Sequence, residues 1–155
     1  MSAQTARDVM DPKPTVLSAT DTVSKGIGFI MEHRFRNVPI VDERGSYLGV
    51  FGVHCLLRLV LPQAALMEGG LTDLSFASHS LRDLRLRLKQ YEDQPVTICL
   101  SDEAMTVTPD TPLLETLLVL YQSRRSIPVV DPADGRLVGV VSYWDVGKGI
   151  LAQQV

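Results

Sequence analysis

The residues best suited to chemistry lie near the end of this chain of 155 amino acids, where Ser142 and Asp145 stand three positions apart. The spacing is typical of a helix start, with Ser142 as the cap and Asp145 favoured by the positive end of the helix. The same geometry also suits a ligand. An ionised carboxylate only accepts hydrogen bonds and can hold both hydroxyls of a ribose, while the hydroxyl and free backbone N–H groups can hold a phosphate. The two interpretations are compatible, and both stay open.

Two pairs of arginines precede matching apolar runs. Arg124 and Arg125 come just before the run 127–130, and Arg34 and Arg36 have the same place earlier in the chain. Guanidinium groups suit phosphate oxygens, although exposed charges at a helix-to-strand turn are the plain alternative. Arg125 is the better candidate because it is nearer to its strand.

Two aromatic residues, Tyr143 and Trp144, separate Ser142 from Asp145. Their rings can cover a base by stacking. Burial of Trp144 between two halves of the molecule is the alternative.

Other residues that often support catalysis or bind metals have no recognisable spacing. They are His33, His54, His79, Cys55 and Cys99. The sequence also lacks the Gly-x-x-x-x-Gly-Lys-Ser/Thr phosphate loop. We therefore expect no metal, no cofactor and no enzymatic activity. The two cysteines do not suggest a disulfide framework, so a reducing, cytoplasmic setting is the simplest expectation.

The elements that must position these residues follow one plan that is used twice. Pro39 and Pro128 differ by 89 positions, while Gly45 and Gly135 differ by 90. The first copy is predicted to contain a strand at 15–18, a helix capped by Asp21 or Thr22, a hairpin at 37–53 and a helix at 55–60, preceded by a helical turn at 5–10. The second copy is predicted to contain a strand at 104–108, a helix capped by Thr111 with Pro112 at its first position, a hairpin at 127–142 and a helix from Trp144. Each half is too small to bury its own sheet face, so we expect the halves to pack together.

Within the first long helix, Gly26 and Gly28 weaken the helix relative to Ala. We expect these glycines to permit close packing against a neighbour.

The ordered duplication resembles a pair of CBS motifs (named after cystathionine β-synthase), the tandem unit called a Bateman module. The residues that carry this resemblance are Asp21-Thr22, Pro39 to Asp42 and Gly49-Val50 in the first copy, and Asp110-Thr111, Pro128 to Asp131 and Gly139 to Asp145 in the second. The resemblance implies an α/β (α+β) fold of two pseudo-symmetric motifs, each β-α-β-β-α and packed sheet to sheet. It divides the chain into motif 1 at 1–62, a partly helical linker at 63–95 and motif 2 at 96–155.

The resemblance also implies a homodimer with clefts for adenosyl nucleotides between the repeats. In it Asp145 holds the ribose, a basic residue such as Arg125 or Arg124 meets the phosphates, and the backbone of Thr108 reads the adenine edge. The set of expected ligand-binding residues is completed by Ser142, Ile127 and Pro128. The first repeat has Gly52 and Cys55 in place of the Ser and Asp, so we expect one good site per chain.

Charge and hydrophobicity indicate which kinds of partner the protein is expected to lack. The formal charge of −3 gives no general attraction to nucleic acid. The polar start predicts no signal peptide, and no apolar run is long enough to cross a membrane. Leu81, Leu84 and Leu88 mark an amphipathic linker helix with a basic face, either solvated or in contact with a partner.

These observations predict a regulatory sensor that binds AMP, ADP, ATP or a related adenosyl ligand, mainly through the second repeat. The alternative is a ligand-free scaffold that dimerises or docks a regulated protein through residues 81–88. An enzyme is the third and least supported possibility.

Overall fold

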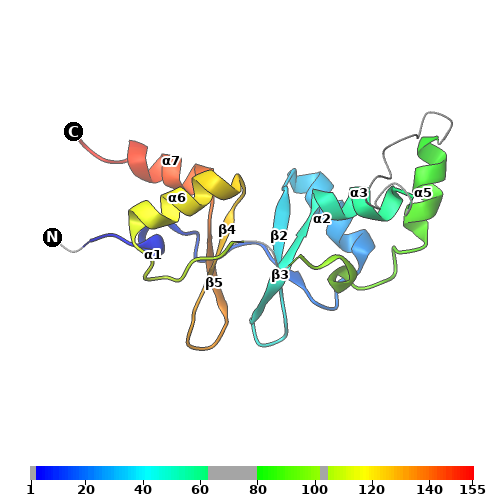
Figure 1. The fold of residues 1–155 in the computed structure, drawn as a ribbon, viewed down its shortest axis with the longest axis horizontal. Coiled ribbons are helices and arrows are strands. Elements are labelled where there is room, and N and C mark those ends of the chain that lie inside the picture. The colour runs from blue at the N-terminus through cyan, green and yellow to red at the C-terminus, as the bar shows by residue number, and fades with distance from the viewer. Residues whose placement is uncertain (1–2, 63–79, 102–104) are drawn as a thin grey trace.

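The computed structural model describes residues 3–62, 80–101 and 105–155, which fold into two lobes of mixed α/β structure (Figure 1). The elements are α1 (Ala6–Val9), β1 (Leu17–Ser18), α2 (Val23–His33), β2 (Asn37–Val41), β3 (Tyr47–Gly52), α3 (Val53–Val60), α5 (Leu81–Lys89), η1 (Val96–Cys99), α6 (Leu113–Ser123), β4 (Ile127–Val130), β5 (Leu137–Val141) and α7 (Tyr143–Leu151). Lobe 1 comprises residues 17–60 and 81–99, and lobe 2 comprises residues 6–9 and 107–151. The predicted fold class of two repeated motifs is confirmed.

Each lobe has a hairpin at its centre. In lobe 1, β2 pairs antiparallel with β3, and β1 pairs parallel with β2 through Leu17 and Ile40. In lobe 2, β4 pairs antiparallel with β5, and a single parallel bridge between Val107 and Val129 stands in place of β1. The strand expected at 104–108 is thus reduced to one bridge, and its first position lies outside the described residues.

The two hairpin turns bind each other where the lobes meet. The Tyr47 N–H donates to the Gly135 carbonyl at 2.9 Å, and the Leu137 N–H donates to the Gly45 carbonyl at 3.0 Å. Gly45 and Gly135 have φ of 81° and 75°, a conformation that glycine adopts without a steric penalty. Figure 1 shows both hairpins in the middle of the molecule, with helices on the outer side of each lobe.

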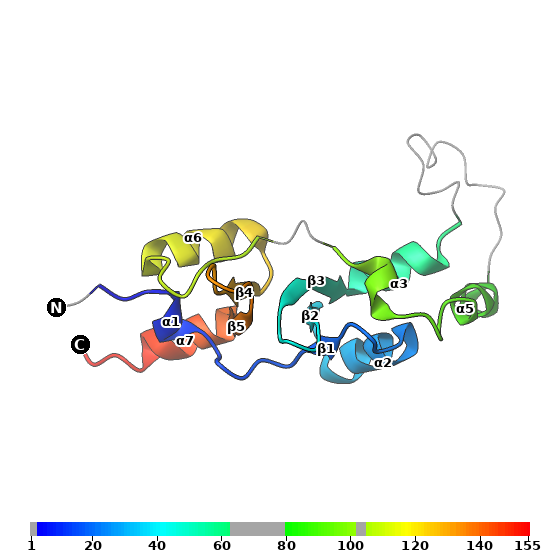
Figure 2. The ribbon, with the colours of Figure 1, turned by 90° about the horizontal axis from the view of Figure 1, so that it is seen from below.

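The segment that leads into each lobe packs on the other lobe. Ala6 of α1 is fully buried in the core of lobe 2, and its N–H donates to the Thr111 carbonyl at 2.9 Å. Val96 of η1 is fully buried in the core of lobe 1, and its N–H donates to the Asp21 carbonyl at 2.8 Å. Figure 2 shows α1 beside α7. This exchange ties the lobes together, since each core includes the segment that precedes the other lobe in the sequence.

The predicted start of α6 is wrong by one residue, and the same exchange of segments explains why. Thr111 was expected to cap this helix with Pro112 at its first position, yet Pro112 is the N-cap, with no side-chain cap hydrogen bond. The reason is pairing with the incoming N-terminal segment, which holds this backbone extended. The Leu113 N–H donates to the Gln4 carbonyl at 3.0 Å, and the Thr111 hydroxyl instead accepts from the Thr108 N–H.

The two glycines of α2 have different surroundings. A Cβ at Gly26 would lie 3.0 Å from side-chain atoms of both Phe51 and Val96, so the expectation of close packing is confirmed there. A Cβ at Gly28 would meet nothing within 4 Å, so the same expectation was wrong for Gly28.

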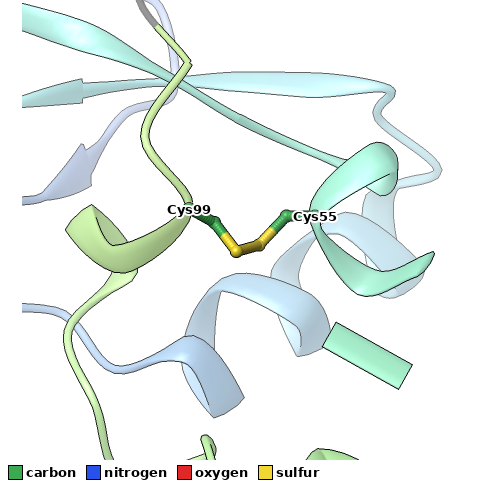
Figure 3. The surroundings of a disulfide bond; sticks show 2 residues. All are labelled: Cys55 and Cys99. Atoms are coloured by element: carbon green, nitrogen blue, oxygen red, sulfur yellow. A yellow bond between two sulfur atoms is a disulfide. The ribbon is translucent and has the colours of Figure 1, made fainter. Parts of the chain in front are cut away.

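The expectation that Cys55 and Cys99 do not form a disulfide is also wrong, because the two residues are joined (Figure 3). Their Cα atoms lie 5.6 Å apart, within the usual range for a disulfide. Sequence spacing gave no sign of this pairing, since the residues are 44 positions apart. The packing of η1 in the core of lobe 1 brings Cys99 to the first turn of α3.

The linker helix predicted at 81–88 is present as α5, which packs on α3. The Arg87 guanidinium donates to the Val60 carbonyl at 2.9 Å. Residues 63–79 of the predicted linker lie outside the described residues. Within the described parts of the chain, no helix combines the length and the apolar character that a membrane span requires.

Candidate functional site

A cleft of about 480 Å³ lies between the lobes, and both lobes contribute to its walls. This volume falls in the range of small-molecule sites. The lining residues are Asp11, Pro14, Thr15, Arg34, Phe35, Arg36, Asn37, Val38, Pro39, Val50, Arg124, Arg125, Ser126, Pro128, Val140, Ser142, Tyr143, Trp144 and Asp145.

Ser142 and Asp145 form a capping box at the start of α7, as their spacing predicts. The Asp145 N–H donates to Ser142 Oγ at 3.2 Å, while Asp145 Oδ2 accepts from the Ser142 N–H at 3.1 Å and from its hydroxyl at 2.7 Å. Asp145 Oδ1 makes no hydrogen bond or ion pair with any described residue. The box therefore fixes one carboxylate oxygen of a residue that lines the cleft, and the other oxygen keeps its capacity to accept hydrogen bonds.

Four arginines reach the cleft, two from each lobe: Arg34, Arg36, Arg124 and Arg125. None of them is ion-paired with another residue in the described ranges. Arg34 and Arg124 both have φ of 57° at the ends of α2 and α6, the left-handed position where a helix commonly ends in glycine. A non-glycine residue there carries a backbone strain of roughly 1 kcal/mol. Equivalent arginines thus occupy strained positions on both sides of one cleft.

Aromatic rings also line the cleft. Trp144 is 79% exposed, so its burial between the lobes, the alternative considered above, is wrong. Tyr143 is anchored by its hydroxyl, which donates to the Leu120 carbonyl at 3.1 Å. Phe35 lies on the opposite lobe and stacks on His33 with ring centroids 5.3 Å apart. The cleft therefore offers apolar ring faces beside its charged groups.

The structure brings together most of the residues expected to bind ligand, but two of them lie elsewhere. Asp145, Ser142, Arg125, Arg124 and Pro128 line the cleft.

Ile127 is fully buried in the core of lobe 2 and does not line the cleft. Thr108 lies in a turn in which its N–H and hydroxyl both meet the Thr111 hydroxyl, at 2.9 and 3.1 Å, and it too is absent from the walls. Its placement beside adenine stays a prediction.

Sequence reasoning gave no role to three residues from the start of the chain that line the cleft: Asp11, Pro14 and Thr15. Asp11 pairs with Val140 of β5 through two backbone hydrogen bonds of 2.8 and 3.1 Å. The repeat register contains a signal for this, because Asp11 and Ser101 are 90 positions apart and Ser101 pairs with Val50 in the same manner.

The matching position in lobe 1 has neither the capping box nor the carboxylate. Gly52 caps α3 without a side-chain hydrogen bond, and Cys55, at the position equivalent to Asp145, is in the disulfide. A Cβ on Gly52 would lie 2.4 Å from Asn37 Oδ1 and 2.8 Å from the Arg36 carbonyl oxygen. In the described part of the chain, no group of three His, Cys, Asp or Glu residues is placed to hold a metal ion.

The family model for the CBS domain matches residues 6–62 and 96–151, which together make up most of the chain. The chain belongs to the CBS domain family. Its two matched regions make it a CBS pair, as the duplicated pattern indicates.

Among curated proteins, this CBS pair is 26% identical over 145 residues to an A-adding tRNA nucleotidyltransferase of Aquifex aeolicus, covering 93% of this chain and 14% of that protein. The chain spans less than two thirds of the length of the curated relatives it matches.

Among solved structures, the CBS pair is similar to CBSX2 of Arabidopsis thaliana in complex with AMP, with a TM-score of 0.68, 21% identity and 96% of each chain covered. It is also similar to CbpB in complex with c-di-AMP, with a TM-score of 0.69, 12% identity, and 97% of this chain and 86% of that chain covered. These likenesses establish the fold.

Proposed function

We propose that this CBS pair is a regulatory sensor that binds an adenine nucleotide in the cleft between its lobes. The observation that carries the proposal is the fixed carboxylate of Asp145, whose Oδ1 has no described partner, in the same cleft as four arginines without ion pairs. A carboxylate acceptor suits a ribose diol, and guanidinium groups suit phosphates. Two structural neighbours with this fold are described as complexes with AMP and c-di-AMP.

The arginines favour a ligand with more than one phosphate. Arg34 and Arg124 keep long charged side chains at backbone positions where glycine is less strained. Four positive charges around one cleft repel one another unless an anion lies between them. ADP and ATP supply more negative charge there than AMP.

Binding across two lobes gives a route to regulation. A ligand held by Asp145 and Arg125 of lobe 2 and Arg36 of lobe 1 favours the lobe arrangement in which all three contacts form. A ligand shifts an equilibrium only by its difference in affinity for the two arrangements. The activity of the tRNA nucleotidyltransferase is not part of this proposal, because the chain spans only 14% of that enzyme.

Calorimetry with AMP, ADP and ATP on Asp145→Ala tests the site. We expect affinity to fall about 100-fold, because hydrogen bonds to a charged group are each worth about 1.5–3 kcal/mol. Asp83→Ala is the matched control, since Asp83 has the same place in the capping box of α5, which packs on α3 in lobe 1. Undiminished affinity in Asp145→Ala, or equal losses in both variants, rejects the site.

Substitution of Arg124 by glycine tests the phosphate contact. Glycine relieves the left-handed strain, so we expect the free energy of unfolding to rise by about 1 kcal/mol while affinity for ATP falls. Opposite signs for stability and affinity separate a binding role from a structural one. An unchanged affinity for ATP contradicts the proposed phosphate contact.

We also propose that the protein works as a homodimer through its outer helices. Large apolar side chains are exposed on helices of both lobes: Met31, Val53, Leu57, Leu114, Leu118, Tyr121, Ile150 and Leu151. Exposed apolar surface of this extent commonly marks an interface. Figure 1 shows α2 and α3 on the same side of the molecule as α6 and α7, opposite the hairpin turns, so a second copy can cover both sets at once.

The homodimer is tested by light scattering on the wild type and on Leu118→Asp. A dimer in the wild type and a monomer in the variant support it. A wild-type monomer contradicts it. A stable dimer that binds no adenine nucleotide favours the alternative function, a ligand-free scaffold.

A further inference from the structure

The Cys55–Cys99 disulfide has no part in the proposed ligand contacts, yet it lies where the two repeats differ most. Cys55 is 90 positions before Asp145, at the third position of its helix, and Cys99 is 90 positions after Val9 of α1. In lobe 2 a capping box holds the first turn of α7. In lobe 1 the cap of α3 makes no side-chain hydrogen bond, and the disulfide joins this turn to η1 instead.

The Cys55 end of the disulfide is connected to the cleft by backbone contacts. Two residues before it, the Val53 N–H donates to the Arg36 carbonyl at 2.9 Å. Gly52 packs so closely on Arg36 and Asn37 that no Cβ fits between them. Arg36 and Asn37 both line the cleft. The first turn of α3 therefore positions one wall of the cleft.

The Cys99 end is connected to the cleft by a second route. Two residues after it, Ser101 exchanges two backbone hydrogen bonds with Val50, of 3.1 and 3.2 Å. Val50 also lines the cleft. One covalent bond thus holds together two segments that each contact the wall of the cleft contributed by lobe 1.

We propose that Cys55–Cys99 is a redox modification site that sets how well the cleft is preorganised, with a dithiol reductant as its reaction partner. A thiolate of the reductant attacks one cysteine sulfur, the S–S bond breaks, and the other cysteine leaves as a thiolate that takes up a proton. The second thiol of the reductant then attacks the mixed disulfide and releases the second cysteine. Two electrons and two protons pass to the protein, and the reductant becomes a disulfide.

Reduction of the disulfide should affect the cleft through both sets of backbone contacts. Cys55 and Cys99 are 4% and 6% exposed, so exchange requires the first turn of α3 to open, and no side-chain cap opposes this opening. Reduction frees α3 and η1 from each other and loosens Arg36 and Val50 together. In its effect on ligand affinity, the inference rests on the proposed nucleotide site.

The test compares the oxidised full-length chain, the chain reduced with dithiothreitol, and Cys55→Ser/Cys99→Ser. Thiol titration should rise from zero to two per chain on reduction. Affinity for ATP should fall about tenfold, a common size for coupling between two sites. The double variant should match the reduced wild type and be insensitive to dithiothreitol. If the variant does not fold, reduced wild type blocked with iodoacetamide replaces it.

Amide hydrogen exchange gives a readout that needs no ligand. Exchange at residues 36–37, 50 and 99–101 should be faster after reduction, while β4 and β5 of lobe 2 stay unchanged. Two free thiols before reduction, or equal exchange in the two redox states, overturns the inference. Equal affinity in both states overturns it as well. If the oxidised protein binds none of AMP, ADP and ATP, the proposed function fails and the exchange data alone decide the redox inference.

Discussion

The starts of α3 and α7 occupy equivalent places in the two repeats but are held by different chemistry. α7 begins with a reciprocal box in which Ser142 and Asp145 satisfy each other's backbone groups. The N-cap of α3 is Gly52, which supplies no side chain, and the third residue of the helix, Cys55, is covalently bound to η1. One helix start has a carboxylate oxygen without a hydrogen-bond partner among the described residues, whereas the other uses its side chain in a covalent bond within the fold.

This difference teaches that a repeated backbone does not imply a repeated site. Both helices follow an antiparallel hairpin, and the second strand of each hairpin pairs with a segment from elsewhere in the chain, Val50 with Ser101 and Val140 with Asp11. In lobe 1, however, Arg36 and Asn37 fill the space beside the helix start. In the first repeat the place of the serine side chain is therefore filled by packing, and both the Ser and the Asp are absent.

Removal of the disulfide, which holds the start of α3 but has no counterpart at α7, should have the largest effect on stability. Cys55→Ser/Cys99→Ser should lower the free energy of unfolding by about 3 kcal/mol, because the bond closes a loop across 44 positions. Denaturant titration of the oxidised wild type and the variant measures the loss. The wild type in dithiothreitol serves as the control and should match the variant. Equal stability of oxidised and reduced wild type would contradict the prediction.

Introducing the serine of lobe 2 at Gly52, the equivalent position of lobe 1, tests whether packing excludes a side chain there. Gly52→Ser should lower the free energy of unfolding by about 2 kcal/mol, since its Cβ would lie 2.8 Å from the Arg36 carbonyl oxygen. Gly28→Ala is the control: a Cβ there meets nothing within 4 Å, and alanine should stabilise the helix by about 1 kcal/mol. Chemical denaturation measures both. A stabilised Gly52→Ser protein would mean that the space is open.

A capping box can be removed at two helix starts, of which one lines the cleft and the other does not. Ser142→Ala and Ser80→Ala should each lower stability by about 1 kcal/mol, because each serine accepts a backbone N–H at its helix start. Only Ser142→Ala should also weaken nucleotide binding, which calorimetry measures. Equal affinities in the two variants would show that the box at α7 has no part in the site.

The smallest expected difference in stability concerns two aspartates at equivalent positions, one in each repeat. Burial tends to raise the pKa of Asp21, but a hydrogen bond from Lys25 at 2.9 Å and one from the Ser18 N–H at 2.7 Å outweigh it, so the pKa lies below its ordinary value of 3.8. Asp110, its counterpart in lobe 2, has a side chain that is 87% exposed, and its ion pair with Arg7 is longer, at 3.5 Å.

Asp21→Asn should therefore lower stability by about 0.5 kcal/mol at pH 7. A depressed folded-state pKa stabilises the protein above the unfolded value, and this contribution is lost as the pH falls through the folded pKa. The difference from wild type should thus disappear on acidification below about pH 4, as thermal unfolding at several pH values would show. Asp110→Asn should leave stability nearly unchanged. A pH-independent loss in Asp21→Asn would contradict this account.

The sequence by itself determined the features that depend on a few neighbouring residues. The hairpins around Gly45 and Gly135, the amphipathic α5 and the capping box of Ser142 and Asp145 all lie where spacing and turn chemistry predict them. The repeat register also fixed the fold class, because two copies of one local pattern must bury their apolar faces against each other.

Only the tertiary structure decided which distant segments meet. The packing of η1 in the core of lobe 1 brings Cys99 to Cys55. The path of the N-terminal segment places Thr15 in the cleft, and its pairing with Pro112 moves the start of α6 by one residue. The exposure of Trp144 and the closed position at Gly52 follow from the same packing. These contacts depend on the path of the whole chain, and residues far apart in sequence carry no local signal of where that path brings them together.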